Sequence, residues 1–227
     1  MKKLLSLLSL LALVFIIIIC SVSNFSHKRV VKVGVVDSYL SAKTLDRYSI
    51  KNTFNLKISE KSNHGDMVVD ILKKQAANID LYYACAINHD DSGEIADVIA
   101  GLKYLKNEEV DVVCLSFTTM NDDAKLHNTI KELTNEGIIV VAACLNYSDT
   151  ATYPASYPEV LSVSNCDYND ANIRITDVKT KNILRTYKWN DCSTSALTAF
   201  ITGQIAKKLS YEALNINSFV EKYNSLN

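Results

Sequence analysis

The sequence predicts an α/β domain with a mainly parallel central sheet flanked by helices. Two observations predict it. Apolar runs of strand length alternate along the chain with stretches whose apolar residues recur every three or four positions. The strand-like runs are apolar on both faces, which is typical of a sheet covered by helices on both sides. Because no internal repeat and no second domain is visible, we expect one folded domain over residues 30–227.

The strands are predicted from short, nearly continuous apolar runs and the helices from periodic apolar faces. In the first long helix, for example, Val68, Ile71 and Leu72 share one face. The predicted strands are Val30–Val36, Ile79–Ile87, Val110–Phe117, Ile138–Ala143 and Val160–Ser164. The predicted helices are His64–Gln75, Glu94–Lys106, Asn121–Asn135 and Ser195–Leu209, with a final helix that contains Ile216 and Tyr223.

Composition narrows the functional classes. The 227 residues include 24 basic and 25 acidic side chains, so the formal net charge is −1, which argues against an electrostatic nucleic-acid binder. Hydrophobic residues make up 48%, enough for a packed core and too many for a disordered chain. Only 6 glycines and 2 prolines are present, which excludes flexible Gly-rich linkers and Pro-rich tails.

The N-terminal segment has the pattern of an export signal. Lys2 and Lys3 precede an apolar run over residues 4–19, and the small residues Ser21 and Ser23 stand at positions −3 and −1 of a cleavage site after Ser23. The run is equally compatible with an uncleaved membrane anchor, and Cys20 raises lipidation as a third alternative. We therefore expect a signal peptide or membrane anchor over residues 1–23, a short linker over 24–29, and an extracytoplasmic domain that is secreted or tethered through residues 4–19.

The six cysteines show neither a CxxC motif nor a Cys/His metal-binding spacing. Three of them, Cys85, Cys114 and Cys144, lie in apolar runs and are predicted to be buried thiols. A disulfide between Cys144 and Cys192 is a minor alternative. The tripeptide at residues 89–91, His-Asp-Asp, is better interpreted as a solvated loop than as a metal site, so no metal is expected.

Three reactive side chains stand at boundaries between predicted elements. Asp37 ends the first strand, His64 opens a helix, and Ser195 opens another. A carboxylate can orient an imidazole, and the imidazole can then take a serine proton so that the hydroxyl attacks a carbonyl carbon. Each residue alone is equally compatible with an ordinary structural role such as helix capping.

Five segments in this order resemble motifs of the subtilisin-like serine protease family, the subtilases. In the family these motifs contain the catalytic aspartate, the catalytic histidine, the oxyanion-binding strand, a Tyr-Pro turn and the nucleophilic serine. The resemblance extends from about Val30 to the C-terminus. The segments are Val31–Ser38, Asn63–Val69, Gly137–Asn146, Tyr153–Val163 and Thr194–Ser195 with Gly203. The resemblance implies a three-layer subtilisin-like fold and serine endopeptidase activity on extended peptide or protein substrates, without a cofactor.

Residue by residue, the resemblance implies the following sites. The catalytic triad would be Asp37, His64 and Ser195, and the side-chain amide of Asn146 would bind the oxyanion together with the backbone N–H of Ser195. Substrate would pair along Ser116, Phe117 and Thr118. Leu145 and Thr118 would form part of the wall of the pocket that binds the substrate residue before the cleaved bond. The sequence leaves the oligomeric state open.

Several glycines of the family pattern are missing. Leu145, Thr118 and Ser193 stand where the family usually has glycine, as does Tyr39. Leu145 and Thr118 predict a narrowed pocket that favours small side chains, and Ser193 is expected to be strained if its backbone needs a positive φ. These departures keep an alternative open, a weak or inactive pseudoprotease that binds peptides or a partner protein.

Overall fold

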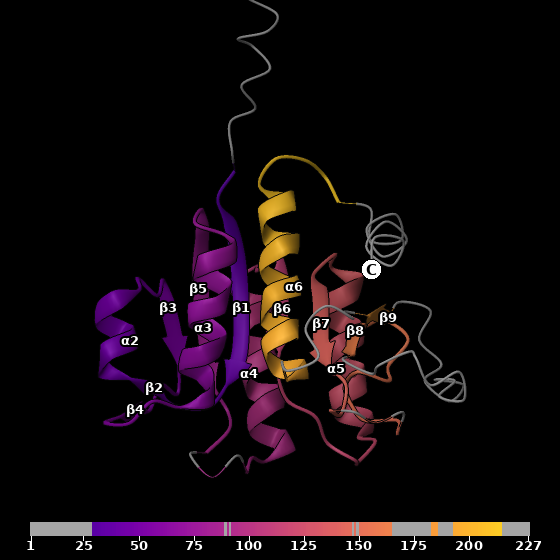
Figure 1. Cartoon of the computed structure of the whole chain (residues 1–227). Helices are drawn as coiled ribbons and strands as arrows, with labels where there is room; N and C mark the ends of the chain where they lie inside the picture. Colours follow the sequence, from indigo (N-terminus) through magenta and orange to yellow (C-terminus); the bar gives the residue numbers. More distant parts are fainter. Residues whose placement is uncertain are drawn as a thin grey trace, which may run out of the picture.

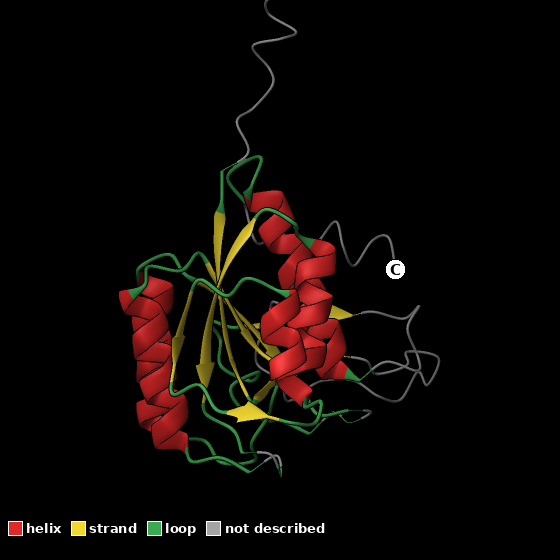
Figure 2. Cartoon of the chain, turned by 90° about the vertical axis from the view of Figure 1, so that its left-hand side faces the viewer, coloured by secondary structure: helices red, strands yellow, loops and turns green. Residues whose placement is uncertain are grey.

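The structure is a computed structural model that describes residues 29–88, 90, 92–146, 148, 150–164, 183–185 and 193–214. Within them, a sheet of seven parallel strands lies between two layers of helices (Figures 1 and 2). From one edge to the other the strands are β3 (Asn52–Phe54), β5 (Ile79–Cys85), β1 (Val31–Asp37), β6 (Val112–Leu115), β7 (Ile139–Ala143), β8 (Leu161–Ser164) and β9 (Ile183–Arg185). The predicted fold class is confirmed.

The four long helices agree closely with the predicted periodic segments. They are α3 (His64–Gln75), α4 (Ile95–Asn107), α5 (Ala124–Asn135) and α6 (Thr194–Leu209). The expected start of α5 at Asn121 is wrong by three residues, because the side chain of Asp123 accepts from the backbone N–H groups of Lys125 and Leu126 and caps the helix there. The final predicted helix and the N-terminal segment 1–23 lie outside the described residues.

The segment between Ser38 and Asn63 holds four short elements that the sequence did not predict. They are β2 (Leu40–Ser41), α2 (Ala42–Arg47), β3 and β4 (Ile58–Ser59), and β2 and β4 form a small two-stranded sheet of their own. In α2 only Thr44 is buried. A six-residue helix with one buried position has no apolar periodicity to detect.

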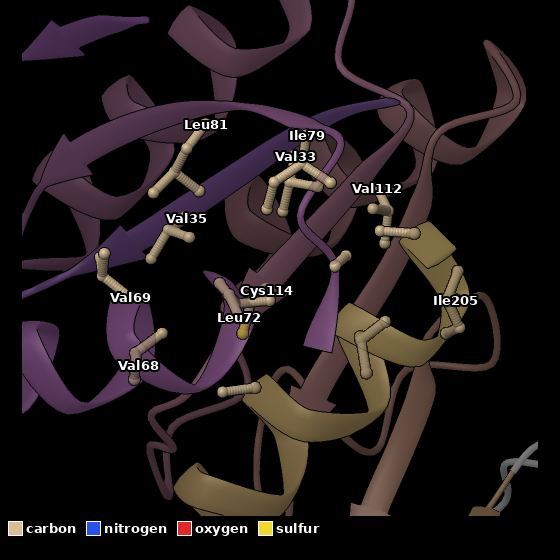
Figure 3. Close-up of a cluster of buried hydrophobic side chains, with 14 of the residues drawn as sticks. Val33, Val35, Val68, Val69, Leu72, Ile79, Leu81, Val112, Cys114 and Ile205 are labelled. Atoms are coloured by element: carbon tan, nitrogen blue, oxygen red, sulfur yellow. The ribbon is translucent and has the colours of Figure 1, made fainter. Parts of the chain in front are cut away.

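The main sheet has two hydrophobic cores, one on each face. On one face, side chains of β1 pack on Val68, Val69 and Leu72 of α3 and on Ile205 of α6 (Figure 3). On the other face, Val98 and Leu102 of α4 and Leu126 and Ile130 of α5 cover the sheet. Helices α3 and α6 therefore share one face of the sheet.

The strand order reverses its direction at β1. From β1 the chain crosses to β5 on one side, then passes through α4 to β6 on the other side, so β1 lies between β5 and β6. In parallel α/β sheets such a reversal opens a crevice beyond the carboxyl ends of the strands. Asp37 is the last residue of β1 and lies at this crevice.

Strand β6 ends at Leu115, two residues earlier than expected, since its pairing with β1 and β7 stops there. Ser116, Phe117 and Thr118 therefore follow the strand as an irregular segment at the same end of the sheet.

In the part of the chain described, no helix is long and apolar enough to cross a bilayer.

Candidate active site

The ring of His64 faces the carboxylate of Asp37. Its Nδ1 lies 2.9 Å from Oδ1 and 3.1 Å from Oδ2 of Asp37. Because an ionised carboxylate can only accept, Nδ1 carries the proton, and the other ring nitrogen, Nε2, is the basic one in the neutral imidazole. The side chain of Asp37 is fully buried, whereas that of His64 is 29% exposed. The pair thus has a buried acid and an accessible base.

The backbone at the end of β1 holds Asp37 in place. Oδ1 of Asp37 accepts the N–H of Ser38 at 2.7 Å, and its carbonyl oxygen accepts the N–H groups of Ala86 and Ile87. A buried carboxylate needs such donors, because an unpaired buried charge is costly. The orientation toward His64 is therefore fixed by a rigid strand end.

His64 is the first residue of α3, and the helix start is fixed to β1 by close contacts. The N–H of Gly65 donates to Ser38 Oγ at 3.0 Å, and Tyr83 Oη donates to the carbonyl oxygen of Ser38 at 2.6 Å. A Cβ added at Gly65 would overlap Tyr83 Oη. The glycine beside the candidate base is thus required by close approach of neighbouring groups.

Asp66 ties α3 to the preceding segment. Its Oδ2 accepts the N–H of Asn63 at 2.7 Å, and its Oδ1 accepts the N–H and hydroxyl of Ser41 at 2.9 and 3.0 Å. Burial by itself raises the pKa of Asp66, but hydrogen bonds from Thr44, Ser41 and Asn63 outweigh it and hold the pKa below its ordinary value. The carboxylate is therefore a structural anion that fixes the turn before His64.

Ser195 lies in the first turn of α6 and exchanges hydrogen bonds with Ser116. Its Oγ donates to the carbonyl oxygen of Ser116 at 2.8 Å, and Ser116 Oγ donates to the carbonyl oxygen of Ser195 at 3.3 Å. Since a hydroxyl has one proton, the bond to the carbonyl oxygen of Ser116 uses the proton of Ser195 Oγ. This pair of bonds joins residues 79 positions apart and is not foreseeable from the sequence.

Asn146 follows β7 and is joined to the start of α6. Its Oδ1 accepts the N–H of Thr194 at 2.7 Å and the hydroxyl of Thr194 at 3.0 Å. Because a backbone N–H can only donate, these bonds identify the amide oxygen and orient the amide nitrogen. The oxyanion residue expected from sequence is thus connected to the residue before Ser195.

A cavity of about 260 Å³ brings most of the expected residues together. It is lined by Asp37, Ser38, His64, Ile87, Ser116, Phe117, Thr118 and Ser195. Leu145, half-buried in the loop after β7, is not among these lining residues in the described part of the chain. The structure therefore brings together six of the eight expected site residues around one hollow, with Asn146 attached through Thr194.

The backbone at Ser193 is not strained. Its φ is −64°, an ordinary extended conformation, and its Oγ accepts the N–H of Ala196 at 3.3 Å as the N-cap of α6. The condition under which strain was expected, a positive φ, is therefore not met, and Ser193 acts as a helix cap.

The predicted buried thiols are confirmed for the described cysteines. Cys85 and Cys114 are buried free thiols, and Cys144 is buried as well. Burial raises the pKa of Cys114 to about 12, so this residue stays a thiol although its Sγ lies 3.2 Å from Ser116 Oγ. Cys192 lies outside the described residues, as do His89 and Asp91.

Comparison with known proteins identifies the family. The model of the subtilase family matches residues 29–210. The minor extracellular protease Epr of Bacillus subtilis (strain 168) is 26% identical over 150 residues, which cover 59% of this chain and 23% of that protein. The major intracellular serine protease of the same organism is 28% identical over 139 residues, covering 53% of this chain and 44% of that protein. The chain thus spans less than half the length of these two relatives.

Solved structures show the same fold at lower sequence identity. An alanine mutant of the protease domain of PatA superposes with a TM-score of 0.66 at 16% identity, covering 82% of this chain and 80% of that one. The prenylagaramide maturation protease PagA gives a TM-score of 0.63 at 19% identity, covering 79% and 75%. With the family match across most of the chain, these findings establish that the chain belongs to the subtilase family of serine proteases.

Proposed function

We propose that the chain is a serine endopeptidase in which Asp37, His64 and Ser195 form the catalytic triad. One observation carries the proposal: the imidazole of His64 is bonded through Nδ1 to the buried carboxylate of Asp37, beside a cavity that Ser195 also lines. A buried acid that orients an accessible base next to a hydroxyl is the arrangement that nucleophilic acyl transfer needs.

In the first step His64 would take the proton of Ser195 while Ser195 Oγ attacks the scissile carbonyl carbon. Asp37 would keep Nδ1 protonated and stabilise the imidazolium that forms. The proton on Ser195 must first leave the carbonyl oxygen of Ser116, which a rotation about the Cα–Cβ bond of Ser195 achieves. His64 would then give the proton to the leaving amine, and water would hydrolyse the acyl intermediate.

The oxyanion of the tetrahedral intermediate would be bound by the side-chain amide of Asn146 and the backbone N–H of Ser195. Ser195 lies in the first turn of α6, where N–H groups have no intrahelical acceptor. Donors of this kind stabilise the developing negative charge, and loss of one typically slows turnover by about 10²–10³. This mechanism requires no cofactor.

The substrate would be an extended peptide or protein segment whose backbone pairs along Ser116, Phe117 and Thr118. Main-chain bonds of this type give affinity, while side-chain pockets give specificity. Since all three residues line the cavity that holds His64 and Ser195, a paired backbone would run past the nucleophile. Leu145 remains a proposed wall residue.

We propose that the domain acts outside the cytoplasm, secreted or tethered through residues 4–19. The proposal rests on the basic and apolar pattern of the leader. The relatives do not decide the location, since one is named extracellular and another intracellular.

The test is covalent labelling of the full-length chain with a fluorophosphonate, which modifies an activated serine. We expect wild type to be labelled, Ser195→Ala and His64→Ala to be unlabelled, and Asp37→Asn to react about 10⁴-fold more slowly. Ser62→Ala, at an exposed serine two residues before His64, is the matched control and should label like wild type. Circular dichroism would establish that each variant is folded.

The second candidate is a pseudoprotease that binds extended peptides without cutting them. It is favoured by the hydrogen bond that Ser195 Oγ donates to the carbonyl oxygen of Ser116, because this bond uses the one proton of the hydroxyl. A folded wild type that takes no label while retaining affinity for extended peptides would favour it over the enzyme.

A further inference from the structure

Tyr83 carries a polar atom into the core on the face of the sheet that α3 covers. Its side chain is fully buried, and it lies in β5 paired with Val35, two residues before Asp37 in the neighbouring strand β1. Burial raises the pKa of Tyr83 well above its ordinary value, so the hydroxyl stays protonated. A buried hydroxyl is costly unless it is hydrogen-bonded, so its acceptor indicates what the oxygen does there.

The acceptor is Ser38, which contacts both sides of the Asp37–His64 pair. Tyr83 Oη donates to the carbonyl oxygen of Ser38 at 2.6 Å. The N–H of Ser38 donates to Asp37 Oδ1 at 2.7 Å, and the same Oδ1 lies 2.9 Å from His64 Nδ1. The Oγ of Ser38 accepts the N–H of Gly65, the residue after His64, at 3.0 Å. Through Ser38, Tyr83 is therefore connected to the acid and to the helix start that carries the base.

Tyr83 holds the backbone at the point where strand pairing ends. Asp37 is the last residue of β1, and its pairing with Cys85 is the last between β1 and β5. Ser38 follows outside this ladder, and its carbonyl oxygen is held by the tyrosine hydroxyl. Because β5 lies between β3 and β1 in the sheet, the donor stands on a rigid element. The position of Ser38 is therefore fixed from the neighbouring strand.

We propose that Tyr83 is a positioning residue for the triad: its hydroxyl holds the backbone of Ser38 and thereby fixes the orientation of Asp37 relative to His64. The assignment rests on the proposed function. Tyr83 is not among the residues that line the cavity, so it acts without touching substrate. A carboxylate serves an imidazole base only while it keeps the ring in the correct tautomer and direction, and small displacements of such groups slow acyl transfer.

The test follows the proton on His64 Nδ1, because this proton reports the bond to Asp37 whether or not the protein is an enzyme. Proton NMR of the full-length chain measures its rate of exchange with water in wild type and in Tyr83→Phe, and His64→Ala identifies its signal. We expect exchange to be about tenfold faster in Tyr83→Phe, since one hydrogen bond in a buried site is worth about that factor. The rate of labelling by fluorophosphonate should fall by a similar factor.

Three controls separate positioning from a general loss of stability. His127 Nε2 lies 3.0 Å from Glu159 Oε2, so its proton is an internal reference whose exchange should not change. Tyr82→Phe removes the hydroxyl of the next residue in β5, which belongs to the core on the other face, and should behave like wild type. Ile130→Val weakens that other core without touching the junction of β1 and α3, and it should leave both rates unchanged.

A second variant, Ser38→Ala, removes the hydroxyl that holds Gly65 and leaves Tyr83 in place. It should also speed exchange of the His64 proton, and it replaces Tyr83→Phe if that variant does not fold. Exchange that stays at the wild-type rate in the folded variant would overturn the positioning role, even if fluorophosphonate labels wild type. Faster exchange in Tyr83→Phe but not in Tyr82→Phe, in a protein whose Ser195 takes no label, would support the positioning role and reject the protease.

Discussion

Ser195 and Ser116 hold each other through two reciprocal hydrogen bonds, from Ser195 Oγ to Ser116 O at 2.8 Å and from Ser116 Oγ to Ser195 O at 3.3 Å. The same carbonyl oxygen lies in the segment along which we expect substrate to pair. A substrate N–H that takes this oxygen would compete with Ser195 and release the hydroxyl toward His64. We therefore predict that substrate binding and readiness of the nucleophile are coupled.

Two peptidyl phosphonates that differ only by a methyl group on the nitrogen next to the phosphorus centre test this coupling. We expect the N-methyl compound to label wild type at least about tenfold more slowly, because it cannot donate to Ser116 O. A small alkyl fluorophosphonate without that nitrogen serves as the reference for intrinsic reactivity. Equal labelling rates for the two peptidyl compounds would contradict the coupling.

The N-cap of α6 gives a second prediction. Because Ser193 has φ of −64° and caps the helix, Ser193→Gly should not raise activity. We expect it to lower the free energy of unfolding by only a few tenths of a kcal/mol, and Ser193→Ala by about 1 kcal/mol. Thermal or urea unfolding checks stability, and the fluorophosphonate labelling rate checks activity. A faster rate in the glycine variant would mean that the serine does impede the site.

The close packing around Gly65 gives a third prediction, which concerns stability. Gly65→Ala introduces a Cβ that overlaps the buried Tyr83 Oη, so we expect a loss of about 1–3 kcal/mol in unfolding free energy. Tyr83→Phe alone loses the 2.6 Å bond to Ser38 but removes the overlapping oxygen. The double variant should therefore be less destabilised than the sum of the two single changes. Simple additivity in urea unfolding would rule out the contact as the cause.

Asp66 gives a pH-dependent prediction. Its pKa is lower in the folded protein than the ordinary value of 3.8, so the ionised form stabilises the fold. This contribution is fully present above about pH 4 and is lost as the pH falls through the folded-state pKa. We expect Asp66→Asn to cost about 1–3 kcal/mol at pH 6 and progressively less below pH 4.

Asp46→Asn, at an exposed position of α2, is the matched control and should show neither effect. Urea unfolding of the three proteins between pH 2.5 and pH 7 provides the measurement. A difference between wild type and Asp66→Asn that stays constant over this range would refute the proposed role of the carboxylate.

The long helices and strands were predictable because the spacing of their apolar residues shows which faces are buried. Strands buried on both faces, such as β1 and β5, appear as nearly continuous apolar runs, and α3 begins and ends at the predicted residues. The segment that holds β2, α2, β3 and β4 escaped prediction, since its elements are only two to six residues long and are largely exposed.

The site was predictable to the extent that it depends on strand and helix ends. Asp37 and His64 stand at such ends within segments that resemble subtilase motifs, and the structure brings their side chains together. The role of Asp66 was not predictable, because its partner Ser41 comes 25 residues earlier in an unpredicted turn.

Helices α3 and α6 are in contact far from the cavity. A Cβ added at Gly203 would come within 2.5 Å of Gln75 Cβ, and Gln204 Nε2 donates to Gln75 Oε1 at 2.7 Å. At 1.5 Å per residue, Gly203 lies about 12 Å from Ser195 along α6, and Gln75 lies about 16 Å from His64 along α3. This contact therefore fixes the ends of α3 and α6 that lie away from the site, and we expect a larger side chain at Gly203 to shift the two helices relative to each other and so to change reactivity at His64 and Ser195 from outside the cavity.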